Sequence, residues 1–563
     1  MKIQFMGAAR TVTGSCHVIE TEHCRFAVDC GMHQGNSEID KRNYASRDYR
    51  PDELDFILLT HAHIDHSGLV PRMVREGFNG PVYCTEPTLD LLRIMLLDSA
   101  HIQVMETEWA SRKRARRSLP EIAPLYDEAD AADAIALLRS TPYNTTLEPA
   151  PGVKVCYRDA GHILGSAFLE IETAEADGPV RLLFSGDLGR PDALIVNDPA
   201  VPSGDFDYLF MESTYGNRDH KNEDKSRDEL VEAIRYSYDN GEKTIIPAFA
   251  VERTQEILLL LNLLHREGRL PADLPVYVDS PLAIKATKIF RDHSAYYDAA
   301  TKAITEAGED PFSLPGLVYA SKTDDSRAIN EQKGPAIVIS ASGMCNAGRI
   351  KHHLRHNLWR KGASVVFVGF QAMGTPGRRL VDGAKSITIL GDEISVEAKI
   401  FTIGGFSGHA GQSQLLNWLN DFQKKQMKVV LVHGEEKAQD ALAALIKERF
   451  GLEVYMPQYL ETLELFPGRM PLMAEDLPAR GDWINWDKVF NLTEDTGRKL
   501  QAAARTAATL PWAEQLELLE QITEITERIQ SLARIQNLTV EGIQPDVGSA
   551  HTRQALAVPG PGD

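Results

Sequence analysis

The sequence predicts an α/β protein in which one domain is inserted into another. Two patterns predict this fold class: short apolar runs that end in Gly, Asp or His, and a later stretch in which strand-like and helix-like segments alternate. With 563 residues the chain is too long for one hydrophobic core. Because domains average about 150 residues, we expect three or four folding units.

The apolar runs come first along the chain. They are rich in Val, Ile, Leu and Phe and lie at residues 24–31, 54–66, 180–189 and 208–216. Continuous apolar runs with polar residues only at the end are typical of strands buried on both faces. The polar residues follow the strands, at the edge of the sheet where open α/β folds hold their ligands. We therefore expect a functional site at these strand ends.

The alternating segments lie in the middle of the chain. A strand is predicted at 244–250 and a helix at 252–268, and three further strand-like runs follow with helical segments between them. This alternation is typical of a parallel sheet. A buried strand ending in a histidine then returns at 428–435. We therefore predict a discontinuous domain of residues 1–211 and 383–466, interrupted by an inserted domain of residues 212–382.

The composition changes again beyond Pro467, and residues 467–563 are predicted to form a C-terminal helical extension of unknown role. Within it, residues 510–537 have helical spacing, because five apolar residues repeat at intervals of four and three positions. They are Leu518, Ile522, Ile525, Ile529 and Leu532. This spacing fits a short coiled-coil seam or a helix packed on the body of the protein, and two heptads do not distinguish them.

Composition and charge exclude several classes of protein. The hydrophobic fraction of 43% and the charged fraction of 25% are those of a soluble globular protein, not of a disordered or collagen-like chain. No run reaches the roughly 20 apolar residues that span a bilayer, and no signal sequence is evident, so we predict a cytoplasmic protein without membrane contact. The six cysteines form no CxxC pair and are expected to be reduced. The net charge of −20 argues against nonspecific coating of nucleic acid, so a polyanion would need a local basic site or metal ions.

The strongest chemical signal is the segment THAHIDHSG at residues 60–68. It has three histidines and an aspartate directly after a predicted buried strand. If the segment is extended, the side chains of His61 and His63 point the same way and can hold one metal ion. Asp65 and His66 lie where the chain turns into a helix and can face a second ion. The segment therefore predicts a site for two metal ions.

Further candidate ligands follow other predicted strands. His162 in DAGHILGSA and His433 in VLVHGE each supply one imidazole, and Asp187 in FSGDLG can bridge two ions through its two oxygens. The complete set has nitrogen and oxygen donors and no thiolate. Such a set suits zinc, and manganese and iron also accept it.

These motifs resemble a known family. HAHIDH, together with His162, Asp187 and the Asp29 that ends FAVDCG, is similar to the motifs of the metallo-β-lactamase fold. The segments ESTYG (212–216), FSGHAG (406–411) and VHGE (432–435) resemble the further motifs of its β-CASP branch. That branch comprises nucleic-acid phosphodiesterases, including the nuclease subunit of the cleavage and polyadenylation specificity factor and its bacterial and archaeal homologues. The resemblance covers about residues 1–466. It implies an αββα sandwich with an inserted β-CASP domain as a lid over the metal site, and it favours a homodimer.

The resemblance also implies a zinc-dependent ribonuclease that acts on single-stranded RNA. Two zinc ions per chain would lower the pKa of a water between them, so that hydroxide attacks the phosphodiester in line. Asp65 is expected to orient this hydroxide as well as bind metal. His409 is expected to donate a proton to the leaving 3′ oxygen, with Glu212 holding it, and Asp29 to hydrogen-bond a ligand histidine and fix its orientation. Cleavage within the strand is expected, with 5′–3′ exonuclease activity as a second mode.

Contacts to RNA are predicted in the inserted domain. The loop ISASGMCNAGR (339–349) ends a strand and opens a helix whose first backbone amides can hold a phosphate. The candidate phosphate-binding residues are Ser340, Ser342, Arg349 and Arg378. The small residues of this loop also fit a tight strand-to-helix turn without a ligand. The basic stretches 348–361 and 112–117 are either solvated surface or patches that guide RNA.

Two other functions are compatible with these motifs. A small-molecule hydrolase acting on a lactam or a thioester, or resembling a glyoxalase, would use the same fold and metals. A non-catalytic RNA-binding partner subunit would have lost its metal site. The inserted domain and the His409–Glu212 pair argue against the first alternative. The presence of every expected ligand argues against the second.

Overall fold

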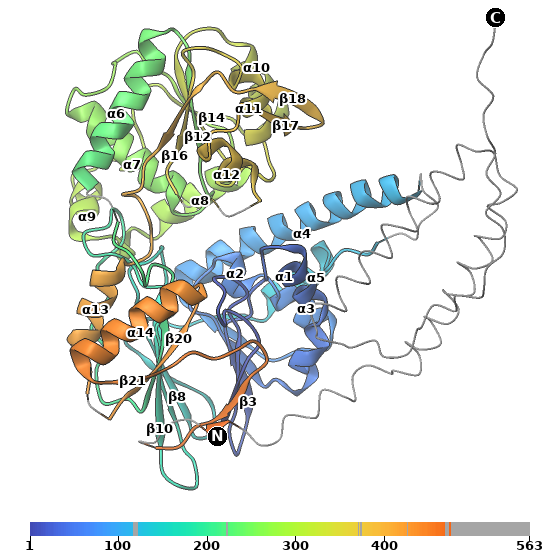
Figure 1. Cartoon of the computed structure of the whole chain (residues 1–563), viewed down its shortest axis with the longest axis vertical. Helices are drawn as coiled ribbons and strands as arrows, with labels where there is room; N and C mark the ends of the chain where they lie inside the picture. Colours follow the sequence, from blue (N-terminus) through green and yellow to red (C-terminus); the bar gives the residue numbers. More distant parts are fainter. Residues whose placement is uncertain are drawn as a thin grey trace, which may run out of the picture. The chain divides into compact units, whose positions relative to one another are not determined.

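The structure of the protein is a computed structural model, drawn in Figure 1. It describes residues 1–115, 122–220, 223–369, 371, 374–424, 426–467 and 472–473. The helical extension predicted for residues 467–563 lies outside these residues, apart from Pro467 and the short strand β23 (Leu472–Met473). The last two residues of the basic stretch 112–117 also lie outside them.

The first sheet has eight strands within the described residues. Its order is β23, β22 (Thr462–Glu464), β1 (Lys2–Phe5), β2 (His17–Glu20), β3 (Arg25–Val28), β4 (Phe56–Leu58), β5 (Val82–Cys84) and β6 (Leu138–Ser140). The pairings from β3 to β6 are parallel, whereas those from β23 to β3 are antiparallel. The short helices α1 (Ser37–Lys41) and α2 (Ile64–Ser67) lie in the connections around β4.

The second sheet has seven strands in the same part of the chain. Its order is β21 (Glu453–Tyr455), β20 (Lys428–Val432), β11 (Tyr208–Glu212), β10 (Val180–Phe184), β9 (Ala167–Thr173), β8 (Val153–Asp159) and β7 (Thr146–Ala150). Three of its pairings are parallel: β10 with β11, β11 with β20, and β20 with β21. In the β11–β20 pair, Glu212 lies opposite Val432, so strands far apart in the sequence are neighbours.

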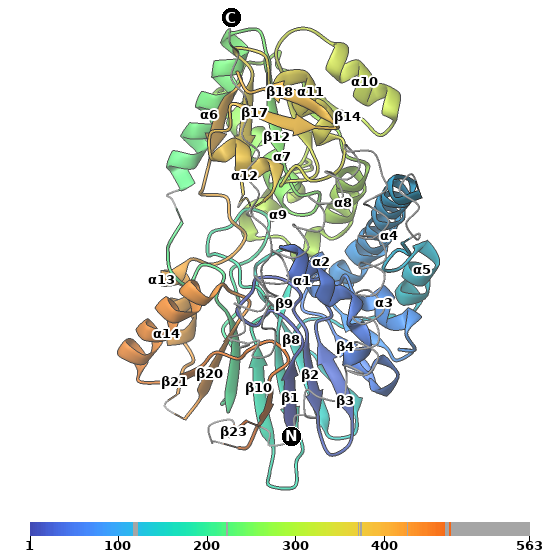
Figure 2. The same ribbon diagram turned by 45° about the vertical axis from the view of Figure 1, so that its right-hand side comes forward.

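The two sheets pack face to face, and helices cover their outer faces (Figures 1 and 2). In β11, Tyr208 and Phe210 pack into the core between the sheets. Leu209 and Met211 point the other way, toward α13 (Gln412–Asn420) and α14 (Glu436–Phe450), because successive strand side chains face opposite sides. The helices α3 (Val70–Arg75), α4 (Glu86–Ala115) and α5 (Glu128–Ala136) cover the other sheet. The result is the αββα sandwich expected from the sequence.

The inserted unit has a six-stranded parallel sheet of its own in the described residues. The sheet order is β14 (Leu317–Tyr319), β13 (Val276–Val278), β15 (Ala336–Ser340), β12 (Lys243–Pro247), β16 (Ser364–Phe367) and β19 (Lys399–Thr402). Its helices are α6 (Glu223–Asp239), α7 (Arg253–Arg266), α8 (Pro281–Asp292), α9 (Ala299–Glu306), α10 (Thr323–Glu331), α11 (Ile350–Asn357) and α12 (Pro376–Val381). A small hairpin, β17 (Ser386–Ile389) and β18 (Asp392–Ser395), precedes β19.

The sheet topology moves one predicted domain boundary. β19 pairs with β16 in the inserted sheet, so a boundary at residue 383 would divide that sheet. The sequence did not reveal this because the hairpin before β19 interrupts the strand–helix alternation. We propose residues 213–402 as the limits of the inserted unit, since β11 ends at Glu212 and β19 at Thr402.

The inserted unit contacts the sandwich through helices. α8 packs against α4, and both views show them side by side (Figures 1 and 2). His293, directly after α8, places its Nε2 2.9 Å from a carboxylate oxygen of Asp90 in α4. The side-chain amide of Asn197 donates to the carbonyl of Tyr296 at 3.2 Å. Across the described part of the chain, no helix combines the length and apolar character needed to traverse a bilayer.

Candidate metal centre

The seven predicted ligands follow the ends of four strands of the two sheets; five lie in loops, and Asp65 and His66 lie in α2. β4 ends at Leu58, β8 at Asp159, β10 at Phe184 and β20 at Val432, and a predicted ligand follows each end. β10 and β20 run parallel within one sheet, so their carboxyl ends meet at the same edge. His61 and His63 lie in the loop between β4 and α2, outside any strand.

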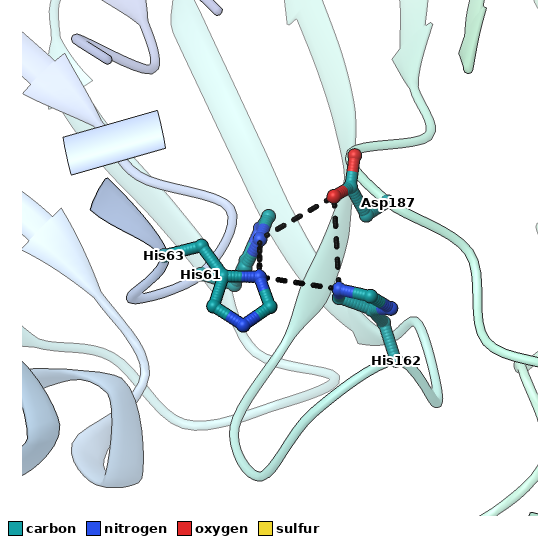
Figure 3. A group of neighbouring side chains, drawn as sticks. All are labelled: His61, His63, His162 and Asp187. Atoms are coloured by element: carbon teal, nitrogen blue, oxygen red, sulfur yellow. Dashed lines mark hydrogen bonds and ion pairs between the residues drawn. The ribbon is translucent and has the colours of Figure 1, made fainter. Parts of the chain in front are cut away.

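The first group consists of His61, His63, His162 and Asp187, whose ligand atoms all lie within 4.8 Å of one another. Their side chains point toward a common centre (Figure 3). Nδ1 of His63 lies 3.1 Å from Nε2 of His61 and 3.3 Å from Nε2 of His162. Oδ2 of Asp187 lies 3.6 Å from Nε2 of both His61 and His162. One cation at the centre could contact all four side chains.

The second group consists of Asp65, His66 and His433, again within 4.8 Å. The two imidazoles approach through their Nε2 atoms at 3.1 Å, and Oδ2 of Asp65 lies 3.6 Å from Nε2 of His433. Oδ1 of Asp187 lies 3.3 Å from Nε2 of His66, so the two oxygens of Asp187 face different groups. This Oδ1 is buried and has no hydrogen-bond partner. A buried carboxylate oxygen without a donor is what a shared cation would satisfy.

The electrostatics of the first group suit a metal ion. Burial lowers the pKa of His61 and His162 well below the usual range and lowers that of His63 to about 4, so these rings are neutral at pH 7. Burial by itself raises the pKa of Asp187, but the neighbouring His433, His66 and His409 lower it by more. Neutral imidazoles and an ionised carboxylate are the donors that zinc prefers. The residues therefore fit a metal ion.

His66 differs from the other histidines because two carboxylates hold its proton. Burial lowers its pKa, but Asp187 and Asp29 raise it by more, to well above the usual range. Asp65 has its pKa lowered to about 2; burial opposes this shift, while His433, His66 and His63 outweigh burial. Without a cation, His66 carries a proton at neutral pH. Metal binding at this group must displace that proton from Nε2.

Asp29 hydrogen-bonds His66. Its Oδ2 lies 2.7 Å from Nδ1 of His66, and both its oxygens also accept the hydroxyl of Thr60 at 3.0 Å. The backbone N–H of Thr60 donates to Oδ1 at 2.8 Å, and the hydroxyl of Ser15 donates to Oδ2 at 3.3 Å. The Thr60 hydroxyl also lies 3.0 Å from Nδ1 of His61. Thr60 was not singled out from the sequence, although it directly precedes the first histidine.

Two other supporting contacts come from distant segments. Nδ1 of His162 lies 3.1 Å from the carbonyl oxygen of Gly408, and Nδ1 of His433 lies 3.1 Å from the hydroxyl of Thr214. A Cβ added at Gly408 would lie 3.2 Å from Cε1 of His162, so a larger residue here would require the His162 ring to shift by a few tenths of an ångström. A backbone carbonyl has no side-chain signature, and sequence reasoning missed both contacts.

His409 and Glu212 form a pair beside the first group. Nδ1 of His409 lies 3.3 and 3.2 Å from the two oxygens of Glu212 and 3.8 Å from Oδ2 of Asp187. Glu212 is fully buried and also accepts the backbone N–H of Leu188 at 2.6 Å. Burial lowers the pKa of His409, but Glu212 and Asp187 raise it by more, to about 9. The His409 side chain is 21% exposed, so a protonated imidazole reaches the surface here.

The four candidate phosphate-binding residues each have a partner within the inserted unit. The hydroxyl of Ser340 is buried and donates to the carbonyl of Asp279 at 2.8 Å, and that of Ser342 donates to Ala347 at 3.4 Å. The guanidinium of Arg349 pairs with the Asp279 carboxylate at 2.7 Å. Arg378 pairs with Asp382 on α12 at 2.8 Å. These contacts fit the tight turn that the sequence left as an alternative, and phosphate binding by these residues stays a prediction.

Three sequence families match successive parts of the chain. The metallo-β-lactamase superfamily matches residues 9–164, the Beta-Casp domain matches residues 254–380, and the Zn-dependent metallo-hydrolase RNA specificity domain matches residues 393–457. The first match includes His61, His63, Asp65, His66 and His162, and the third includes His409 and His433.

The chain is also similar to curated proteins over most of its length. It is 37% identical over 461 residues to a protein named Ribonuclease TTHA0252 of Thermus thermophilus, covering 82% of this chain and 99% of that protein. It is 29% identical over 476 residues to a protein named Transcription termination factor FttA of Methanocaldococcus jannaschii, covering 83% and 72%. The FttA of Methanosarcina mazei is 30% identical over 478 residues, with the same coverage.

Proposed function

The chain belongs to the β-CASP branch of the metallo-β-lactamase superfamily and is a metal-dependent hydrolase, and on that premise we propose that it hydrolyses phosphodiester bonds of single-stranded RNA. The observation that carries the proposal is the His409–Glu212 pair, which lies beside the first ligand group with Nδ1 of His409 3.8 Å from Asp187. A departing ribose oxygen needs a proton, and this pair can supply one. The match to an RNA specificity domain and the name of the 37% identical relative support RNA as the substrate.

We propose two zinc ions as the metals. His61, His63 and His162 would hold the first ion, Asp65, His66 and His433 would hold the second, and Asp187 is a candidate ligand of each. Bound there, the ions would supply Lewis-acid charge to the scissile phosphate and lower the pKa of water. The matched domain described as Zn-dependent supports zinc over manganese or iron. The homodimer that the family favours stays a prediction.

His409 acts as the general acid in this proposal. Glu212 accepts at Nδ1 of His409, which leaves the other ring nitrogen to face the substrate. Glu212 also accepts the backbone N–H of Leu188, so the carboxylate is held on two sides and fixes the ring. As the bond between phosphorus and the 3′ oxygen breaks, the imidazolium proton passes to that oxygen. The products are a 3′ hydroxyl and a 5′ phosphate. A carboxylate that keeps the imidazole protonated near pH 7 suits this role.

Asp65 lies at the exposed side of the site in the second group. Its side chain is 24% exposed, whereas those of His66 and Asp187 are 1% and 2% exposed. A carboxylate at that position can accept a hydrogen bond from an attacking water or hydroxide and so orient its lone pair toward phosphorus. We propose this orienting role for Asp65 in addition to metal binding.

The proposal is tested with one single-stranded RNA labelled separately at its 5′ and 3′ ends. Internal fragments from both labels, lost with a chelator and in Asp65→Ala, are expected for an endonuclease. Mononucleotide released from the 5′ label would add exonuclease activity. Intact RNA from a preparation with two zinc ions per chain would contradict the proposal, and a small-molecule hydrolase would then be the better assignment.

The role of His409 has a separate test. His409→Gln is expected to slow cleavage of ordinary RNA by about 10²–10⁴-fold, the range typical of a general acid. RNA with a sulfur in place of the leaving 3′ oxygen needs no proton at that atom. The same variant should therefore slow cleavage of the sulfur-containing RNA far less. Equal slowing on both substrates would contradict proton donation by His409.

A further inference from the structure

The loop that carries His162 is held by hydrogen bonds from three parts of the chain. Within the loop, the hydroxyl of Ser166 accepts the N–H groups of His162 at 3.0 Å and Ile163 at 3.2 Å. From the sandwich, the hydroxyls of Thr85 and Thr88 donate to the carbonyl of Gly165 at 2.6 and 2.9 Å. These bonds leave the N–H of Leu164, in the middle of the loop and fully buried, to be satisfied from elsewhere.

That N–H donates to a residue of the inserted unit. Its acceptor is Oε2 of Glu252, 2.9 Å away, although 88 positions separate the two residues in the sequence. Glu252 is the N-cap residue of α7, directly before Arg253, and its backbone carbonyl accepts the N–H of Glu256 at 2.9 Å. Its side chain is buried at 4% exposure. The first turn of α7 therefore fixes the position of a carboxylate that reaches into the metal-site loop.

Two features of Glu252 are unfavourable for folding. Its backbone has φ of +65°, a region that favours glycine, and its Oε1 is buried without a hydrogen-bond partner. Glycine would relieve both features. Local strain that a fold retains is often connected with function, and within the described residues this side chain accepts the N–H of Leu164.

We propose that Glu252 is a positioning residue through which the inserted unit holds the His162 loop in its metal-binding conformation. The proposal rests on the metal site of the proposed function. With Leu164 anchored by Glu252 and Gly165 anchored by the two threonines, the backbone of the loop is held on both sides. The ring of His162 then meets the carbonyl of Gly408 at one nitrogen and offers the other to the metal. Losing the Glu252 contact frees the Leu164 peptide to rotate and loosens His162.

The test measures zinc binding by the full-length protein without RNA. Zinc content is determined at a series of buffered free-zinc concentrations for wild type, Glu252→Gly and Glu252→Gln. Because supporting contacts of metal ligands typically change metal affinity 10- to 100-fold, Glu252→Gly is expected to shift one binding step to about 10-fold higher free zinc. His162→Ala identifies that step, since it removes a ligand of the same ion. Glu252→Gln keeps an oxygen acceptor for Leu164 and is expected to stay within about threefold of wild type.

A matched control separates positioning from general damage to the inserted unit. Asp298 caps α9, in the same unit, by accepting the N–H of Thr301, and it contacts none of the proposed ligands. Asp298→Gly is expected to lower the melting temperature of the metal-free protein and to leave both zinc steps unchanged. Glu252→Gly is expected to do the reverse: an unchanged or higher melting temperature without metal and one weakened zinc step.

Wild-type zinc binding in Glu252→Gly would overturn the inference. Equal weakening of both steps together with a lower melting temperature of the metal-free protein would also overturn it, because that result indicates only loss of folding. Neither readout uses RNA, so failure of the chain to cleave RNA would contradict the proposed function and leave this inference to be judged on zinc binding alone.

Discussion

Replacing Asp29 by asparagine changes one carboxylate oxygen of the side chain that hydrogen-bonds His66 into an amide nitrogen. Asparagine keeps the shape of the side chain and tolerates the positive φ of +61° at this position. It replaces one acceptor oxygen by an NH₂ group. Both oxygens of Asp29 accept buried donors: Oδ1 from the N–H of Thr60 at 2.8 Å and Oδ2 from Nδ1 of His66 at 2.7 Å. In either orientation the NH₂ group therefore faces a donor.

The orientation that keeps the Thr60 contact places the NH₂ group against His66. Nδ1 must then give up its hydrogen to become an acceptor, which leaves the one remaining ring proton on Nε2, the atom proposed to bind metal. Losing a charge-assisted contact and leaving a buried donor unsatisfied costs about 1–3 kcal/mol. Since 1.4 kcal/mol is about a factor of ten, Asp29→Asn is expected to weaken zinc binding at the second group by roughly 5- to 150-fold.

The assay combines zinc content at buffered free zinc with nitrogen NMR of the His66 ring. The NMR signals distinguish a hydrogen on Nδ1 from one on Nε2, so they report the tautomer directly. Asp55→Asn is the matched control, because Asp55 also accepts a backbone N–H through its carboxylate, that of Arg25 at 2.8 Å, and is not among the proposed ligands or their hydrogen-bond partners. Wild-type zinc affinity in Asp29→Asn, with the hydrogen still on Nδ1, would refute the reasoning.

Three further predictions concern the same centre. Gly408→Ala is expected to weaken zinc binding about tenfold, because the added Cβ would lie 3.2 Å from Cε1 of His162; unchanged binding would show that the ring can shift freely. In metal-free protein the pKa of His409 is raised to about 9, above its ordinary value of 6.5, so its pairing with Glu212 stabilises the fold fully below pH 6.5 and is lost as the pH rises through 9. The melting temperatures of wild type and His409→Asn should therefore converge as the pH rises from 6.5 to 9. A difference in melting temperature that stays constant over this pH range would contradict the pairing. If the free zinc concentration before chelation is 1,000-fold above Kd, removing the zinc is expected to lower the free energy of unfolding by about 4 kcal/mol per site. Denaturant titration measures this change. No change on chelation would argue against a metal bound to the folded state.

The candidate ligands could be predicted from the sequence because their signals are local. Three histidines and an aspartate within six residues are a dense pattern, and the other ligands directly follow apolar runs. The structure brings all seven predicted ligands into two adjoining groups. The parallel arrangement of β10, β11 and β20 explains why residues so far apart in the sequence meet at one edge.

The supporting contacts could not be predicted in the same way. Gly408 acts through a backbone carbonyl, and Glu252 acts through a contact to a segment 88 positions away, so neither has a recognisable local pattern. Arg349 shows what a local pattern leaves out: a basic residue after a small-residue loop suggests phosphate binding, which stays a prediction, while the pattern gives no sign that its guanidinium pairs with Asp279. The position of β19 also depends on pairing with β16 rather than on a local signal, which is why the boundary at 383 divides a sheet.

The pairing of β11 with β20 has a consequence for how the protein is made. Glu212 and Val432 are neighbours in that pair, and the whole inserted unit is synthesised between them. At translation rates of about 5–20 residues per second, roughly 10 to 50 s pass between Asp187 and His433. Throughout that interval the growing chain already contains the first ligand group and lacks His433, and for most of it the chain lacks His409 as well. On the proposed function, a chain that has not yet reached His409 and His433 can gather one metal ion but cannot yet cut RNA, including the message that encodes it.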